Sequence, residues 1–153
     1  MQALELKIPP PVVMLLLIVG MYFGSGAAPA MHYEFALRWP IGVLLGLVGL
    51  AVNVAGLQAF RRHRTTVNPL QPGRATELVC DGIFRWTRNP MYLGMVVMLA
   101  GWAVYLANGL AFVGPVMLFA WLTRFQILPE ERALRHKFPG AFDNYARRVG
   151  RWL

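Results

Sequence analysis

The sequence has little charge and almost no cysteine. Of its 153 residues, 14% are charged, only 7 are acidic, and Cys80 is the single cysteine. One cysteine excludes an intrachain disulfide and a cysteine-ligated metal cluster, and we expect no metal site. By contrast, 57% of the residues are hydrophobic, more than a soluble domain of this length can bury. The composition therefore indicates a single membrane domain, residues 1–153.

The shortage of acidic residues leaves a net charge of +8. In a soluble chain this excess would suggest nucleic-acid binding. Here the basic residues cluster between and after apolar runs, a distribution that suits an anionic membrane surface. We therefore expect contacts with membrane lipids and none with nucleic acid.

Four apolar stretches approach the length of about 20 residues that a membrane-spanning helix needs. The first could be taken for a signal peptide, but three prolines precede it and we interpret it as a retained helix. Asn108 and Gly109 form a turn signal between the last two, which predicts a tight antiparallel helical hairpin. The stretches cover about residues 11–30, 40–60, 91–106 and 110–127.

The second stretch contains small and polar residues. Gly42, Gly46 and Gly49 would let helices approach closely in lipid. We interpret Asn53 and Gln58 as residues that hydrogen-bond between helices, with a cavity-facing role as the alternative.

Basic residues are concentrated in the loop 61–90 and the tail 128–153, whereas the first loop holds only Arg38. The positive-inside rule then puts both termini, the middle loop and the tail in the cytoplasm. The expected fold is an all-α integral membrane protein with about four transmembrane helices, the last two a hairpin. The loop and short C-terminal helices are expected to cap a cofactor pocket.

The middle loop ends in the polar segment RWTRNPMYLG. Pro90 suits a first helical turn, and Asn89 can cap it. The free N–H groups of that helix start can hold a carboxylate, beside Tyr92. Alternatively, Arg85 and Arg88 anchor lipid headgroups and Tyr92 is an interfacial aromatic residue.

The tail begins with two adjacent acids, Glu130 and Glu131, after Pro129. Acids in a first turn are ordinary partners of the helix dipole, but carboxylates here can also pair with a cation or hold ribose hydroxyls. The segment FPG is predicted to split the tail into two short helices. A helical stripe of apolar residues follows the acids: Leu134, Phe138, Phe142, Tyr145 and Val149.

Four motifs follow one another in the second half of the chain: LVCDGIF, RNPMYLG, EERAL and KFPGAFDNYARRV. In this order they resemble the isoprenylcysteine carboxyl methyltransferase family and its phospholipid methyltransferase relatives. The family pattern reads roughly L-V-x-x-G-x-[YF], R-[HN]-P-x-Y-x-G, E-E-x-x-L and F-G-x-x-[YF]-x-x-Y. The resemblance covers about Thr65 to the C-terminus. It implies S-adenosylmethionine as cofactor and a lipophilic acceptor that enters from the bilayer.

The resemblance also implies residue roles. Asn89 and Tyr92 would flank the methionine end of the cofactor, and Glu130 with Glu131 would bind it. Arg124 would hold a substrate carboxylate, so the candidate catalytic residues are Arg124, Glu130 and Tyr92. Further residues that would line the cofactor are Thr76, Leu78, Val79 and Phe84.

Asn89 stands where eukaryotic members usually carry histidine. Asparagine cannot act as a base near neutral pH, which suits an acceptor that is already ionised, such as a prenylcysteine-like carboxylate. A lipid amine is the alternative acceptor. His63 and His136 lie on the predicted cytoplasmic side, where we interpret them as headgroup contacts.

Two other functions remain open. Membrane sterol reductases have a similar C-terminal arrangement and use NADPH, although they are far longer and this chain has paired acids. A non-enzymatic membrane module would use its arginines for lipid and its glycines for assembly. The short chain suggests a prokaryotic inner membrane, and the glycines leave the oligomeric state undetermined.

Overall fold

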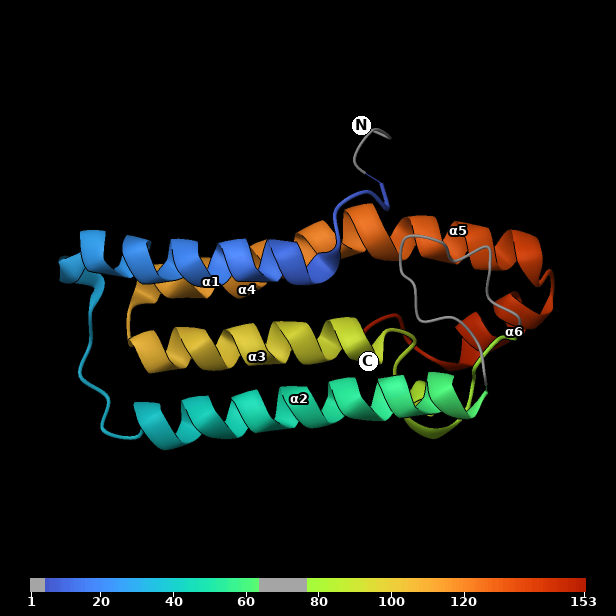
Figure 1. Ribbon diagram of the computed structural model, residues 1–153, viewed down its shortest axis with the longest axis horizontal. Helices are drawn as coiled ribbons and strands as arrows, with labels where there is room; N and C mark the ends of the chain where they lie inside the picture. Colours follow the sequence, from blue (N-terminus) through green and yellow to red (C-terminus); the bar gives the residue numbers. More distant parts are fainter. Residues whose placement is uncertain (1–4, 64–76) are drawn as a thin grey trace.

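The apolar runs form long helices in the computed structural model, which describes residues 5–63 and 77–153 (Figure 1). Within these ranges the backbone forms helices and turns and no strand, apart from one isolated bridge between His32 and Asn108. The fold is all-α, as predicted. The principal helices are α1 (Pro10–Ala27), α2 (Arg38–Arg62), α3 (Pro90–Leu106), α4 (Val113–Leu122), α5 (Leu128–Lys137) and α6 (Ala141–Arg148).

Short irregular helices join these elements. Three are 3-10 turns and the fourth, η6, is a π-helical turn that links α4 to α5. They are η2 (Pro29–Met31), η4 (Gly82–Arg85), η5 (Gly109–Phe112) and η6 (Thr123–Ile127).

In the described part of the chain, three helices are long and apolar enough to cross a membrane: Pro10–Ala27, Arg38–Arg62 and the continuous helix Gly109–Lys137. Helix α3 is also apolar, but its 17 residues fall short of the others. At 1.5 Å per residue it is about 26 Å long, against a hydrocarbon core of about 30 Å. The prediction of four spans is therefore supported for three helices, and α3 as a fourth span stays a prediction.

The fourth apolar stretch was predicted to end at about residue 127, but the helix that contains α4 continues to Lys137. It runs through η6 into α5 as one rod (Figure 1). Pro129 lacks the N–H that would bond the carbonyl of Phe125 four residues earlier. That carbonyl instead accepts from the backbone N–H of Leu6, 3.1 Å away. The irregular turn thus gives the N-terminal segment a place to bind.

Helices α2 and α3 approach each other closely because glycines face glycines. A Cβ atom built on Gly49 would lie 2.5 Å from the carbonyl oxygen of Gly94, and one on Gly101 would lie 2.7 Å from that of Gly42. Gly46, in contrast, has open space around it. The predicted close helix contact is confirmed. Gly46 takes part through its backbone N atom, 3.1 Å from a Cβ built on Gly101, but its own Cβ position is open.

The two polar residues of α2 do not behave as predicted. The Nδ2 atom of Asn53 donates to the carbonyl of Gly49 in its own helix, 3.3 Å away, because the side chain is pressed against Gly94. No bond between helices is needed to explain it. Gln58 is exposed.

The predicted hairpin turn is confirmed. Ala107 takes a left-handed conformation with φ of 49°, and Oδ1 of Asn108 accepts from the N–H of Leu110 at 2.9 Å. The wholly buried Asn108 side chain also donates to the carbonyls of Ser25 and Ala28. This asparagine therefore fastens α1 to the hairpin.

The alternating helix directions bring the polar segments together. In Figure 1 the start of α1, the end of α2 and the start of α3 lie at the same end of the bundle as α5 and α6. The predicted break at FPG is also confirmed, because α5 ends at Lys137 and α6 begins at Ala141 after Gly140 with φ of 76°. The loop before α3 and the tail thus share one end of the molecule.

Candidate cofactor and acceptor site

The core of the site is a contact between α3 and α5. The buried Tyr92, in the first turn of α3, donates its hydroxyl to Oε1 of Glu130 on α5. These residues come from the two motifs RNPMYLG and EERAL. The structure therefore joins the two motifs in one contact.

The second acid of the pair faces different partners. The carboxylate of Glu131 is 9% exposed and accepts two bonds from Arg151, from Nε at 3.0 Å and from Nη2 at 2.8 Å. Nη2 of Arg88 lies 3.2 Å from Oε1 of Glu131. The bonds with Glu131 raise the pKa of Arg151. Two guanidinium groups against one carboxylate leave a positive charge in excess.

Asn89 stands at the start of α3, but the prediction that its side chain caps the helix is wrong. No side-chain cap bond is made there. The Nδ2 atom of Asn89 instead donates to the carbonyl of Arg151 at 2.9 Å, and its backbone N–H donates to Oγ1 of Thr87 at 3.1 Å. The C-terminal segment takes the amide group because it crosses directly over the helix start.

Three predicted cofactor residues lie in a separate apolar cluster beside α6. Val79 and Phe84 are buried there with Tyr145, and Leu78 packs against them. The hydroxyl of Tyr145 donates to the carbonyl of Phe84 at 2.7 Å, and burial raises the pKa of Tyr145. Thr76 lies outside the described residues. The cluster supports the loop end that leads into α3.

Arg124 pairs with the N-terminal segment and not with either acid of the tail. Its Nη1 atom donates to Oε1 of Glu5 at 2.6 Å, and Arg132 donates to the other carboxylate oxygen. The bond with Arg124, followed by the charge of Arg132, lowers the pKa of Glu5. Gln126, wholly buried in η6, donates to the carbonyl of Ile8 at 2.9 Å. The segment before α1 therefore pairs with the guanidinium group predicted to hold substrate, which stays partly exposed.

The end of α2 carries a histidine between two acids. Nδ1 of His63 lies 3.1 Å from Glu77 and Nε2 lies 3.0 Å from Asp81. Hydrogen bonds to Glu77 and then Asp81 raise the pKa of His63. These acids flank Leu78 and Val79, so His63 ties that segment to α2. The lipid-headgroup role of His63 stays a prediction.

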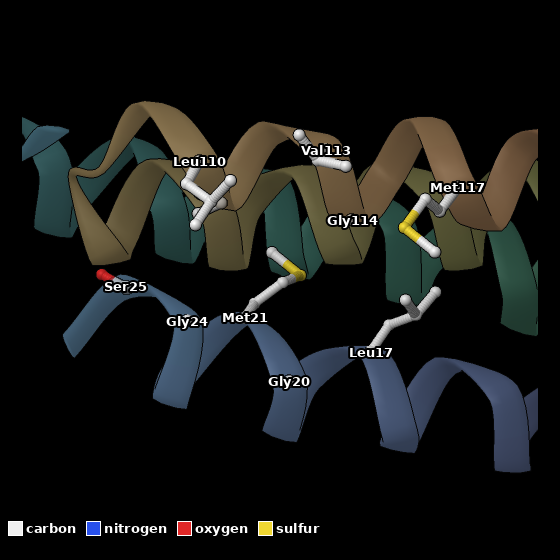
Figure 2. Close-up of a pocket in the computed structure, with 10 residues that line it drawn as sticks. Leu17, Gly20, Met21, Gly24, Ser25, Leu110, Val113, Gly114 and Met117 are labelled. Atoms are coloured by element: carbon white, nitrogen blue, oxygen red, sulfur yellow. The ribbon is translucent and has the colours of Figure 1, made fainter. Parts of the chain in front are cut away.

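An apolar hollow of about 290 Å³ lies elsewhere, between α1 and α4 (Figure 2). Met21 and Leu17 of α1 face Gly114 and Met117 of α4 across it. It lies away from the end of the bundle that holds Tyr92. Among the described residues, no group of three His, Cys, Asp or Glu is placed to hold a metal ion.

Comparison with known proteins agrees with this arrangement of motifs. The profile of the phospholipid methyltransferase family matches residues 37–141, which include both Tyr92 and Glu130. An uncharacterized protein of Haemophilus influenzae (strain ATCC 51907 / DSM 11121 / KW20 / Rd) is 36% identical over 63 residues, which is 41% of this chain and all of that protein. No solved structure matches.

The chain belongs to the phospholipid methyltransferase family. Membership and the apolar helices together indicate an integral membrane methyltransferase that acts on lipid-like substrates.

Several residues of the site were missed by the sequence reasoning. Arg151 and Arg88 were counted only as basic residues near the membrane, and Thr87, Trp152 and the hydroxyl of Tyr145 had no role. The signal that could have found Arg151 is its place directly after short C-terminal helices that were already expected to cap the cofactor pocket.

Proposed function

We propose that the protein transfers a methyl group from S-adenosylmethionine to a lipophilic acceptor. The observation that carries the proposal is the contact between Tyr92 and Glu130, which unites two motifs at the polar end of an apolar bundle. The proposed acceptor is a prenylcysteine-like carboxylate, with a lipid amine as the alternative.

The residues at this end fit the chemistry of that cofactor. S-adenosylmethionine carries an ammonium group, a sulfonium group, a carboxylate and ribose hydroxyls. Glu130 and Glu131 are acceptors for cations or hydroxyls. The guanidinium of Arg88 is 11% exposed, and its Nε atom is buried with no hydrogen-bond partner among the described residues. A buried donor of this kind, with positive charge in excess around it, suits an anionic group.

Each residue has a proposed role. Glu130 and Glu131 hold cationic or hydroxyl groups, Asn89 and Tyr92 orient the reactive end, and Leu78, Val79 and Phe84 form an apolar wall, with Thr76 beside them in the sequence. When bound, the cofactor supplies a methyl group on a positively charged sulfur. The protein contributes alignment of the acceptor with that methyl group, which can provide much of the acceleration.

The acceptor is expected to need no base from the protein. A carboxylate is already ionised near neutral pH, and Asn89 cannot remove a proton. Arg124 is the proposed partner of that carboxylate. Its present pairing with the carboxylate of Glu5 supports this role, because the guanidinium already binds a group of the same chemistry.

The orientation is part of the same proposal. Both termini, the middle loop and the candidate site would face the cytoplasm, in a prokaryotic inner membrane, with α3 as the fourth span. The acceptor would reach the site from the bilayer. The positive-inside rule supports this orientation, because the end of α2, the start of α3 and the tail lie at one end of the bundle.

Calorimetry of the protein in detergent tests the proposal. We expect S-adenosylmethionine to bind with micromolar affinity, on the order of −8 kcal/mol, and NADPH not to compete. Incubation with methyl-labelled cofactor and lipid extracts, followed by mass spectrometry, then identifies the acceptor. Absence of binding in several detergents would refute the methyltransferase proposal, and protection by NADPH alone would favour a reductase.

A further inference from the structure

We propose that the C-terminal segment Gly150–Trp152 is a latch over the candidate cofactor site, and that it opens when Arg151 leaves Glu131. The inference rests on the proposed function, because it takes Asn89 and Glu131 as residues that bind S-adenosylmethionine.

The latch is fixed to the start of α3 through its backbone. The N–H of Arg88 donates to the carbonyl of Gly150 at 3.1 Å. The carbonyl of Arg151 accepts from Nδ2 of Asn89 at 2.9 Å and from the hydroxyl of Thr87 at 3.4 Å. Three consecutive residues before α3 thus bind two consecutive carbonyls of the segment.

The next residue of the latch reaches the long rod on the other side. Nε1 of Trp152 donates to Oγ1 of Thr123 in η6 at 3.2 Å. The indole also stacks on Phe119 of α4, with ring centroids 4.5 Å apart. The segment therefore spans from the start of α3 to the π-helical turn.

The side chain of Arg151 binds the carboxylate of Glu131, which a cationic ligand would need. Its two bonds engage both oxygens of the Glu131 carboxylate. A bidentate guanidinium occupies the preferred directions of a carboxylate, and Arg88 takes a third contact. Arg151 must therefore leave before Glu131 can pair with an ammonium or sulfonium group. The side-chain amide of Asn89 is also occupied, because it donates to the carbonyl of Arg151.

The two arginines that contact Glu131 differ in the exposure of their side chains. The Arg88 side chain is 11% exposed and precedes α3 directly, whereas the Arg151 side chain is 36% exposed and follows the last helix, α6. Arg151 is thus the partner that can exchange for another cation, while Arg88 stays in place.

The variant Arg151→Gln tests the latch by calorimetry with S-adenosylmethionine. Removing an internal competitor raises the binding-competent fraction, so the apparent Kd should fall roughly three- to tenfold. Arg151→Lys keeps the charge but not the bidentate bond. Its apparent Kd should lie between those of the unaltered protein and Arg151→Gln. Arg148→Gln is the matched control, because Arg148 is exposed and its Nε bonds the carbonyl of Asn144 in its own helix. It should leave the Kd unchanged.

An unchanged or higher Kd for folded Arg151→Gln, checked by circular dichroism, would overturn the latch. Hydrogen exchange at the Arg88 amide gives a second answer in the unaltered protein. That amide is bonded to Gly150, so saturating S-adenosylmethionine should speed its exchange, and slower or equal exchange would overturn the latch even if the variant does not fold. If the unaltered protein binds no cofactor at all, the proposed function itself fails.

Discussion

The hydroxyl of Tyr92 on α3 bonds the carboxylate of Glu130 on α5, 38 positions further along the chain. The variant Tyr92→Phe removes the donor and leaves a largely enclosed carboxylate without it. We expect unfolding stability to fall by about 1–3 kcal/mol and cofactor affinity to fall with it. Thermal unfolding and calorimetry measure both effects. Tyr22→Phe, on the exposed face of α1, is the control and should change neither.

The variant Glu130→Gln separates charge from hydrogen bonding at the same contact. Glutamine still accepts a bond from Tyr92 but carries no negative charge. We expect stability near that of the unaltered protein and a loss of S-adenosylmethionine binding of about tenfold or more, since a charge-assisted bond contributes about 1.5–3 kcal/mol. Unchanged affinity in calorimetry would remove Glu130 from the cofactor-binding residues.

The glycine contact between α2 and α3 makes a prediction about stability. A methyl group on Gly49 would meet the backbone of Gly94, so Gly49→Ala should destabilise the protein by about 1–3 kcal/mol through overpacking. Gly46→Ala, one turn away with open space, should be neutral or stabilise by up to about 1 kcal/mol through helix propensity. Denaturation in detergent compares the two. Equal effects would mean that the helices are not in close contact there.

The histidine at the end of α2 predicts a pH dependence. The pKa of His63 is raised in the folded protein by Glu77 and Asp81, so its contribution to stability is fully present below the unfolded value of about 6.5. That contribution is lost as the pH rises through the folded pKa. The thermal midpoint should therefore decline over this range, and His63→Gln should flatten the decline. His136→Gln, exposed on α5, should retain it.

The proposed role of Arg124, which now pairs with Glu5, predicts that its substitution weakens acceptor binding and leaves cofactor binding unchanged. If Arg124 holds the acceptor carboxylate, Arg124→Gln should raise the acceptor KM about tenfold or more and leave the Kd for S-adenosylmethionine unchanged. Arg135→Gln, which breaks an exposed pair with Asp143 and a cation–π contact with Phe142, is the control. A lower kcat without a change in KM would contradict the role of Arg124 in holding the acceptor.

The helices and their turns could be predicted because their signals are local. Pro90 marks a helix start, Asn108 marks the hairpin turn, and the break at Gly140 follows from a glycine after a proline. Pro129 also predicts a helix start, but it lies within the continuous helix Gly109–Lys137. Tyr92 and Glu130 were expected to lie at one site only because their two motifs resembled those of one family. No periodicity in either segment fixes which side chains meet across 38 positions.

The other contacts could not be predicted because they depend on where separate segments cross. Asn89 looks like a helix cap from its neighbours alone, yet its amide bonds the carbonyl of Arg151. The choice between these partners is decided by a segment 62 positions later. The π-helical turn is similar, since its exposed carbonyl at Phe125 is satisfied by Leu6, near the other end of the sequence.

The π-helical turn η6 holds about one more residue per turn than an α-helix, so it takes up an extra residue without turning the part of the rod that follows. Elsewhere in the rod each residue turns the helix by about 100°. Deleting one position between Thr123 and Ile127 would therefore leave a regular α-turn and keep Glu130 directed at α3. Relatives with one residue fewer between the hairpin turn and the acid pair can thus keep the contact with Tyr92 by forming a regular helix there.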